Sequence, residues 1–258
     1  MVNIFYIISG FTVGLLVGIT GVGGGSLMSP LLILLFGISP TTAVGTDLWF
    51  AAITKSAGTI FHHKYGSIDR RIAILLALGS VPSAIVLLIY LNLSGDTFDR
   101  SFTTNMLGGV LIATSAAMVF REKVRGYMAG RPTSVSATPA LRDAATILCG
   151  MLIGVMVTLT SVGAGAFGAV FLIALYPSLS ARAIAGTDTA HAVPLTIIGG
   201  IGYLFLDEVD LPLLSCLLLG SLPGIAIGTW LCARMDDRYV RILITIVLFA
   251  AGTKLLFR

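Results

Sequence analysis

Four ionisable residues lie inside runs of the chain that are otherwise almost entirely apolar. Asp47 and Asp188 each end a Gly-Thr-Asp triplet. Lys55 follows Asp47 by about two helical turns, and His191 follows Asp188 by one turn, so each pair shares a helix face. Ionisable groups inside apolar segments that cross a membrane are energetically costly, and they mark ion or substrate pathways by default. We predict that Lys55 contacts an anion or acts as its counter-ion, and that the other three residues couple transport to protons or a cation: Asp47, Asp188 and His191.

A structural interpretation of the same residues stays open. Thr46 with Asp47, and Thr187 with Asp188, are residue types that cap the N-terminus of a helix. Lys55 would then pair with an aspartate only to hold the fold together.

Two glycine-rich segments interrupt the apolar runs at corresponding places, namely Thr20–Ser26 and Thr160–Gly165. A helix that restarts after such a break presents free N–H groups and a positive dipole end, which suit an anion. Broken helices in two halves of a chain are a sequence pointer to a transporter's binding site. The alternative is that these glycines only allow helices to cross closely. The predicted substrate-binding residues are Thr20, Gly21, Gly23, Gly24, Gly25, Ser26, Lys55, Thr160, Ser161, Gly163 and Gly165.

Other glycines recur every four residues, as small residues do where helices pack tightly in membranes. One series is Gly10, Gly14 and Gly18, and the other is Gly220, Gly224 and Gly228. We predict packing roles for both series.

The composition identifies the environment of these residues. Of the 258 residues, 56% are hydrophobic and only 11% are charged, whereas soluble domains carry about 25% charged residues. This excludes a soluble enzyme, a nucleic-acid-binding module and a disordered chain, and leaves an integral membrane protein in contact with the lipid bilayer. Residues 1–46 contain no Asp, Glu, Lys or Arg, and as one helix they would be about 69 Å long, roughly twice the hydrocarbon thickness. The chain must therefore turn within this run.

The helices are located from the lengths of the charge-free runs. Hydrophobic periodicity does not help here, because buried helices are apolar on all sides. We expect an all-α polytopic protein in which regions 4–36 and 143–176 are each split by a glycine-rich break. The continuous helices are expected at about 43–63, 71–92, 101–121, 184–205, 211–232 and 239–257.

The chain repeats itself at an offset of 140 or 141 residues. Thr20–Gly25 matches Thr160–Gly165, and Ala43–Asp47 matches Ile184–Asp188. Further matches are Ile68-Asp69 with Val209-Asp210, and Leu78–Pro82 with Leu219–Pro223. The predicted units are a first transmembrane repeat over 1–121, a basic linker over 122–141 and a second transmembrane repeat over 142–258.

Loop charges predict that the two repeats have opposite orientations. Lys- and Arg-rich loops stay on the cytoplasmic side. The loop at 62–71 is basic, whereas its counterpart at 206–210 is acidic, and the central linker is strongly basic and therefore cytoplasmic. Inversion needs an odd number of crossings per repeat. Three transmembrane helices with a glycine-broken re-entrant hairpin satisfy this. Three transmembrane helices with the hairpin extended into two short spans satisfy it as well.

No catalytic, cofactor or metal-binding pattern stands out. The three cysteines, Cys149, Cys216 and Cys232, lie in apolar runs without CxxC spacing and are interpreted as packing residues. The N-terminal segment lacks the basic region of a cleaved signal peptide, so we expect it to be retained.

Taken together, these motifs resemble the sulfite exporter TauE/SafE family of membrane transporters. The resemblance rests on Gly14–Gly25 with Pro30, Ala43–Asp47, Thr54-Lys55, Gly58, Gly66–Asp69 and Gly186–Asp188 with His191, and it covers essentially the whole chain. It implies transport of sulfite, sulfonates or related small sulfur-containing or organic anions across the bacterial cytoplasmic membrane. In the second break, Ser161-Val-Gly-Ala-Gly165 departs from the family's more glycine-rich run, so the two half-sites need not be identical.

We therefore expect a secondary transporter that moves a small anion by alternating access, one repeat rocking against the other. It would be a multi-pass protein of the bacterial inner membrane, not an enzyme. Two rivals remain: an anion channel without coupling, and an intramembrane enzyme using Asp188 and His191 as acid and base. The sequence leaves substrate, direction, coupling ion and oligomeric state open.

Overall fold

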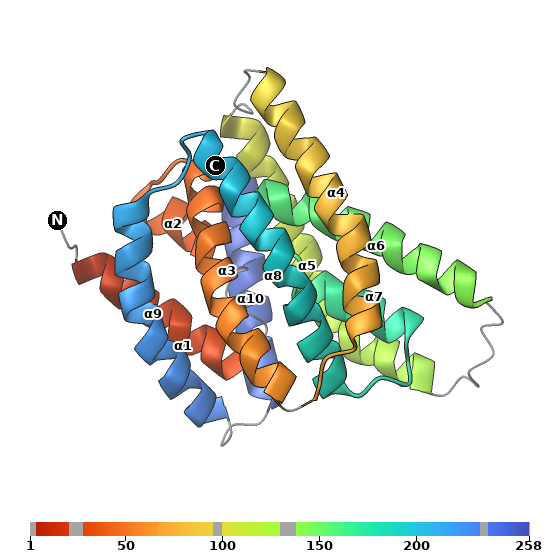
Figure 1. The fold of residues 1–258 in the computed structure, drawn as a ribbon. Helices are drawn as coiled ribbons and strands as arrows, with labels where there is room; N and C mark the ends of the chain where they lie inside the picture. Colours follow the sequence, from red (N-terminus) through yellow and green to blue (C-terminus); the bar gives the residue numbers. More distant parts are fainter. Residues whose placement is uncertain are drawn as a thin grey trace.

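The fold is helical throughout the part of the chain that the structure describes. The computed structural model describes residues 4–20, 28–64, 66–94, 100–129, 138–232 and 237–257. All regular elements in these ranges are helices, which confirms the predicted all-α class (Figure 1).

Within the described residues, each half of the sequence contributes five helices, the second of which is short, with 9 residues in α2 and 10 in α7. The first half forms α1 (Ile4–Thr20), α2 (Met28–Phe36), α3 (Pro40–Lys64), α4 (Arg70–Ser94) and α5 (Arg100–Ala129). The second half forms α6 (Pro139–Thr160), α7 (Ala166–Leu175), α8 (Ala181–Phe205), α9 (Leu211–Cys232) and α10 (Asp237–Leu256). Regions 4–36 and 143–176 are therefore each divided into two helices, as the glycine-rich segments predict.

Capping residues decide where several of these helices begin. Ser39 and Ser180, equivalent at the 141-residue offset, each accept a hydrogen bond from the backbone N–H three residues further on, at 3.2 and 3.1 Å. Asp69 and Asp210 do the same ahead of α4 and α9, at 3.1 and 2.9 Å. Side-chain acceptors of this kind satisfy orphan N–H groups in the first turn. As a result, α3 and α8 begin three residues earlier than predicted.

Four helices in the described residues are long and apolar enough to cross a membrane. Their apolar stretches are Arg70–Leu93, Phe102–Phe120, Pro139–Thr160 and Leu211–Gly228. In α5 the apolar stretch ends near the predicted helix end, but the helix itself continues to Ala129. Since α6 begins at Pro139, both ends of the range predicted as the linker are helical, and residues 130–137 lie outside the described part.

The two predicted glycine series pack against each other's helices. In α1, a Cβ on Gly10 or Gly14 would meet the backbone of α9, at Leu217 and Ser221. In α9, Gly224 in turn lies against the backbone of Phe11. The packing role predicted for both series is confirmed, and the register shows that α1 and α9 run parallel.

The equivalent contact recurs between α4 and α6. A Cβ on Gly150 would meet the backbone of Leu76, and one on Gly154 would meet that of Ser80. Each of these tight pairs joins one helix from each half of the chain. The halves are therefore interlaced, and backbone touches backbone where they meet.

Two further pairs join equivalent helices in antiparallel fashion. Along α3 and α8, Trp49 lies against Gly200. Toward the other end of the pair, a Cβ built on Gly58 would lie 3.6 Å from Cγ2 of Thr189. Between α5 and α10, the Ser115 hydroxyl donates to the carbonyl of Thr245 at 3.2 Å. Antiparallel packing is expected of equivalent helices in two oppositely oriented repeats, an arrangement that stays a prediction. The orientation of the halves relative to a bilayer stays a prediction.

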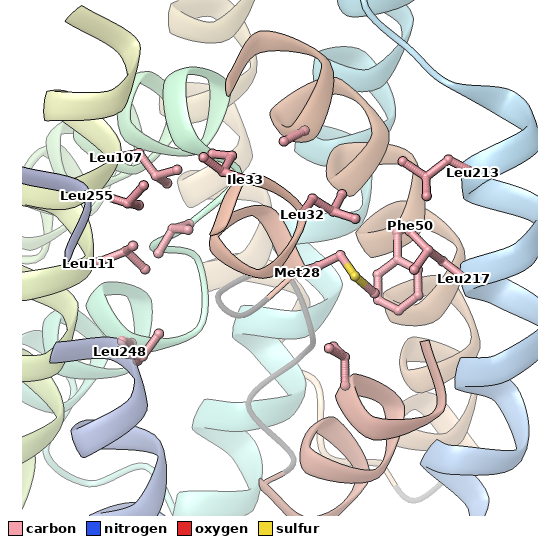
Figure 2. Packing of buried hydrophobic residues seen from close by; sticks show 14 of the residues in the cluster. Met28, Leu32, Ile33, Phe50, Leu107, Leu111, Leu213, Leu217, Leu248 and Leu255 are labelled. Carbon is pink, nitrogen blue, oxygen red and sulfur yellow. The ribbon is translucent and has the colours of Figure 1, made fainter. Parts of the chain in front are cut away.

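The short helix α2 is enclosed by protein rather than left at the surface. Met28, Leu32 and Ile33 on α2 are almost completely buried. Figure 2 shows them between Leu107, Leu111, Leu248 and Leu255 on one side and Phe50, Leu213 and Leu217 on the other. The helix α7 lies in a second buried cluster, through Ala169, Leu172 and Ile173. Ends of short helices are tolerated at membrane depth only where protein surrounds them in this way.

Candidate functional site: carboxylates at the ends of two half-helices

The two Gly-Thr-Asp triplets lie in the second turns of α3 and α8 and do not begin these helices. Because Ser39 and Ser180 hold the capping positions, Asp47 and Asp188 cap neither of their own helices. The interpretation of the triplets as caps of α3 and α8 is wrong for this reason. Both carboxylates instead point into the protein, with side chains at most 5% exposed.

Asp47 lies at the N-terminal end of α2. Its Oδ2 accepts a hydrogen bond from the Ser29 hydroxyl at 2.6 Å and another from the Ser29 backbone N–H at 3.2 Å. The Ser161 side chain, from the break in the other half of the chain, lies near the same carboxylate. A negative group is thus placed where the α2 dipole is positive.

Asp188 occupies the corresponding place at the N-terminal end of α7. Gly168, the third residue of α7, faces its carboxylate so closely that a Cβ on the glycine would collide with it. Glycine is required here because the carboxylate occupies the space that a side chain would take. Both half-helices therefore direct their positive ends toward a carboxylate of the protein.

Lys55 supplies positive charge between these two ends. It lies on α3, it is 7% exposed, and its charge interacts with both Asp188 and Asp47. Burying one cation with two carboxylates is stabilising only if the groups compensate one another closely. Lys55, Asp47 and Asp188 therefore lie close enough to interact electrostatically.

His191 joins this group through a partner that the sequence analysis missed. Its side chain is 1% exposed, its Nε2 lies 2.9 Å from the Ser80 hydroxyl of α4, and the Lys55 charge acts on it. Ser80 could have been noticed, because it belongs to the Leu78–Pro82 repeat match. Its pairing with His191, 111 positions away, could not have been predicted from the sequence.

The break in the second half is ordered by its own backbone and side chains. Ser161 adopts a left-handed conformation, with φ 58°, and its N–H bonds to the Val157 carbonyl at 2.7 Å. The Val162 N–H donates to the Thr160 hydroxyl at 3.2 Å. Gly163, at φ 122°, has a conformation that side chains rarely adopt. Gly165 then precedes the first turn of α7.

The break in the first half is only partly described. Thr20 is the last residue of α1, and its side chain lies outside the described part of the structure. The predicted substrate-binding residues Gly21, Gly23, Gly24, Gly25 and Ser26 lie outside the described residues.

The threonines of the triplets tie the site to neighbouring helices. The Thr46 hydroxyl accepts a hydrogen bond from the Asp210 backbone N–H at 3.1 Å, and the Thr187 hydroxyl accepts one from that of Asp69 at 2.9 Å. These two contacts are equivalent at the repeat offset. They fix the starts of α4 and α9 against the helices that carry the aspartates.

Comparisons with known proteins identify the family of the chain. The family model "Sulfite exporter TauE/SafE" matches residues 6–255. The chain belongs to the TauE/SafE family. It is therefore a multi-pass membrane transporter, as the sequence resemblance implies.

Curated relatives of this TauE/SafE protein are named as transporters as well. "Probable membrane transporter protein YjnA" of Bacillus subtilis (strain 168) is 37% identical over 257 residues, covering 98% of this chain and 100% of the relative. "Probable membrane transporter protein YdhB" of the same organism is 27% identical, with 96% and 97% covered. A relative from Methanocaldococcus jannaschii is 25% identical, with 95% and 92% covered. No solved structure matches the chain.

Proposed function

We propose that this TauE/SafE protein is a secondary transporter that moves a small anion, namely sulfite, a sulfonate or a related sulfur-containing or organic anion. The observation that carries the proposal is Lys55, a buried basic residue whose charge interacts with Asp47 and Asp188, the carboxylates at the N-terminal ends of α2 and α7. Positive helix ends and a basic side chain at membrane depth attract a negative solute.

The carboxylates at these helix ends supply the coupling in this proposal. Asp47 and Asp188 occupy the places where an anion would gain most, so substrate and carboxylates compete for the same positive potential. Protonation of an aspartate, or binding of a cation beside it, would neutralise the carboxylate. The positive helix end could then bind the substrate instead. The anion would then be held by Lys55 with hydroxyl and N–H groups of the two breaks, at 20–26 and 160–165.

The interlaced packing changes which parts are proposed to move. A motion of one repeat against the other would separate α1 from α9 and α4 from α6, where glycines bring backbones into contact. We propose instead that the pairs α1–α9 and α4–α6 move as units around the central α3–α8 pair. Each unit then contains one helix from each inverted repeat.

Uptake into proteoliposomes tests the function directly. Purified protein should accumulate at least one of sulfite, thiosulfate, sulfate or a small sulfonate above the external concentration when a pH gradient is imposed. Uptake that only equilibrates the anion would favour a channel. Conversion of a labelled anion into a product would favour an enzyme, and no relocation of any of them would defeat the proposal.

Single cysteines test the predicted topology. In a cysteine-free background, Lys64→Cys and Asp207→Cys both introduce thiols at exposed positions, at the C-terminal ends of the equivalent helices α3 and α8. With inverted repeats in the inner membrane and a cytoplasmic linker, an impermeant thiol reagent added to intact cells should label only position 207. Labelling of both positions from one side would contradict the inverted arrangement.

A further inference from the structure

His191 is buried with only one of its two ring nitrogens hydrogen-bonded. Nε2 is paired with the Ser80 hydroxyl at 2.9 Å, whereas Nδ1 is buried with no hydrogen-bond partner among the described residues. A buried polar atom left in this way costs free energy of the order of a lost hydrogen bond. A solute bound for part of the transport cycle would supply the missing hydrogen-bond partner.

The contact with the Ser80 hydroxyl bears on which nitrogen of His191 carries the proton. Serine in a helix commonly donates back to a carbonyl four residues earlier, as Ser56 does to Ala52 at 2.6 Å. The hydroxyl of Ser80 instead faces Nε2. When it donates to Nε2, the neutral imidazole carries its hydrogen on Nδ1, because one nitrogen accepts and the other donates. Nδ1 is then a hydrogen-bond donor in need of an acceptor.

Lys55 is the charge near this donor that favours an anionic acceptor. It lies on α3 and acts on His191, and its charge also interacts with Asp188, one turn before His191 on α8, and with Asp47, two turns before Lys55 on α3. A negatively charged oxygen that accepts a hydrogen bond from Nδ1–H would also be attracted by the charge of Lys55.

This combination occurs in only one of the two halves. At the 141-residue offset, His191 corresponds to Phe50 and Lys55 corresponds to Thr196. Phe50 is packed among Met28, Leu213 and Leu217 in the apolar cluster of Figure 2. The aspartates are duplicated, but the imidazole and the ammonium are not.

We propose that His191 is a substrate contact whose Nδ1–H donates to an oxygen of the transported oxyanion, that Lys55 provides the counter-charge, and that Ser80 is the positioning residue that orients the imidazole. The imidazole stays neutral throughout transport, so His191 does not carry the coupling proton that the sequence suggested. This inference rests on the proposed anion transport and assigns the substrate an oxygen acceptor, as in sulfite or a sulfonate.

Two amide substitutions separate the nitrogens of His191. The nitrogen of Asn is bonded to Cγ, like Nδ1, whereas the amide of Gln lies at the level of Nε2. His191→Asn should keep the KM for methanesulfonate within about threefold and retain accumulation driven by a pH gradient. His191→Gln should raise the KM about tenfold or more, the cost of one hydrogen bond to a charged group. Equal KM values for the two variants, or loss of pH-driven accumulation in His191→Asn, would overturn the proposal.

Ser80 has a matched control in the other repeat. Ser80→Ala should raise the KM about tenfold and leave the maximal rate within about twofold. Ser221, the repeat equivalent, is just as buried but donates to the Leu218 carbonyl of its own helix, so Ser221→Ala should leave the KM unchanged. Ser80→Ala in a His191→Gln background should add little, because the two side chains act as one unit. A purely structural serine would lower the thermal midpoint in both variants and leave the KM alone, which would contradict the role of Ser80.

The assay distinguishes this inference from the proposed function. Methanesulfonate keeps a single charge across the accessible pH range, and sulfite serves as the second probe. Absence of uptake by the unaltered protein for both probes would defeat anion transport itself. Uptake by the unaltered protein with the same KM in Ser80→Ala and Ser221→Ala would defeat only the inference about Ser80 and His191.

Discussion

Replacement of Lys55 by Met is expected to abolish anion uptake and to destabilise the protein. Methionine has a similar length but no charge, so Asp47 and Asp188 would remain buried without their shared cation. Removing one partner from a buried charge group costs about 3–5 kcal/mol, a large fraction of a typical folding free energy. Uptake in proteoliposomes and the thermal midpoint of the purified protein in detergent measure the two effects.

A second substitution separates loss of transport from loss of folding. In Lys55→Met with Asp188→Asn, one cation and one carboxylate are removed together, so most of the lost stability should return. Uptake should remain at least a hundredfold below that of the unaltered protein, because the counter-charge for the anion is still missing.

Thr196 provides the control for these experiments. It is the repeat equivalent of Lys55 and is 1% exposed, and among the described residues its hydroxyl donates to the carbonyls of Ala192 and Val193 within α8. Thr196→Val should therefore leave uptake within about threefold. Full transport by the double variant would show that Lys55 is a structural partner of Asp188 and has no direct role toward the anion.

Alanine at all three glycines of the α9 series is expected to prevent the tight packing of α1 against α9. At Gly220, Gly224 and Gly228, a Cβ would collide with backbone atoms of α1, which cannot rotate away as a side chain could. Overpacking costs about 1–3 kcal/mol at each site, so the three together approach the whole stability of a typical protein. The yield of monodisperse protein in size-exclusion chromatography should fall severely.

Gly109 on α5 is the matched control for this triple variant. It is exposed, it lies within a helix, and a Cβ there meets nothing within 4 Å. Gly109→Ala should be neutral or stabilise slightly, because alanine favours the helix by up to about 1 kcal/mol. A triple variant that behaves like Gly109→Ala would mean that α1 and α9 are not in backbone contact.

Several features of this TauE/SafE protein followed from the sequence because they depend on local properties. The scarcity of charge identified a membrane protein, and Gly163 and Gly165 located a break that the structure places between Thr160 and Ala166. The helix starts at Pro40 and Ala181 were not predicted, because the helices were located from the lengths of apolar runs. Their actual starts are set by the capping residues Ser39 and Ser180.

The sequence by itself determined the membrane class, the duplication and the identity of the buried ionisable residues, since apolar runs, repeated motifs and misplaced charges can be recognised along the chain. Only the tertiary structure decided that Asp47 meets Ser29, that Asp188 meets Gly168 and that His191 meets Ser80. Helices that are apolar on all sides carry no periodic signal to say which face meets which neighbour. Which helices the glycine series bring into backbone contact was likewise decided only by the tertiary structure.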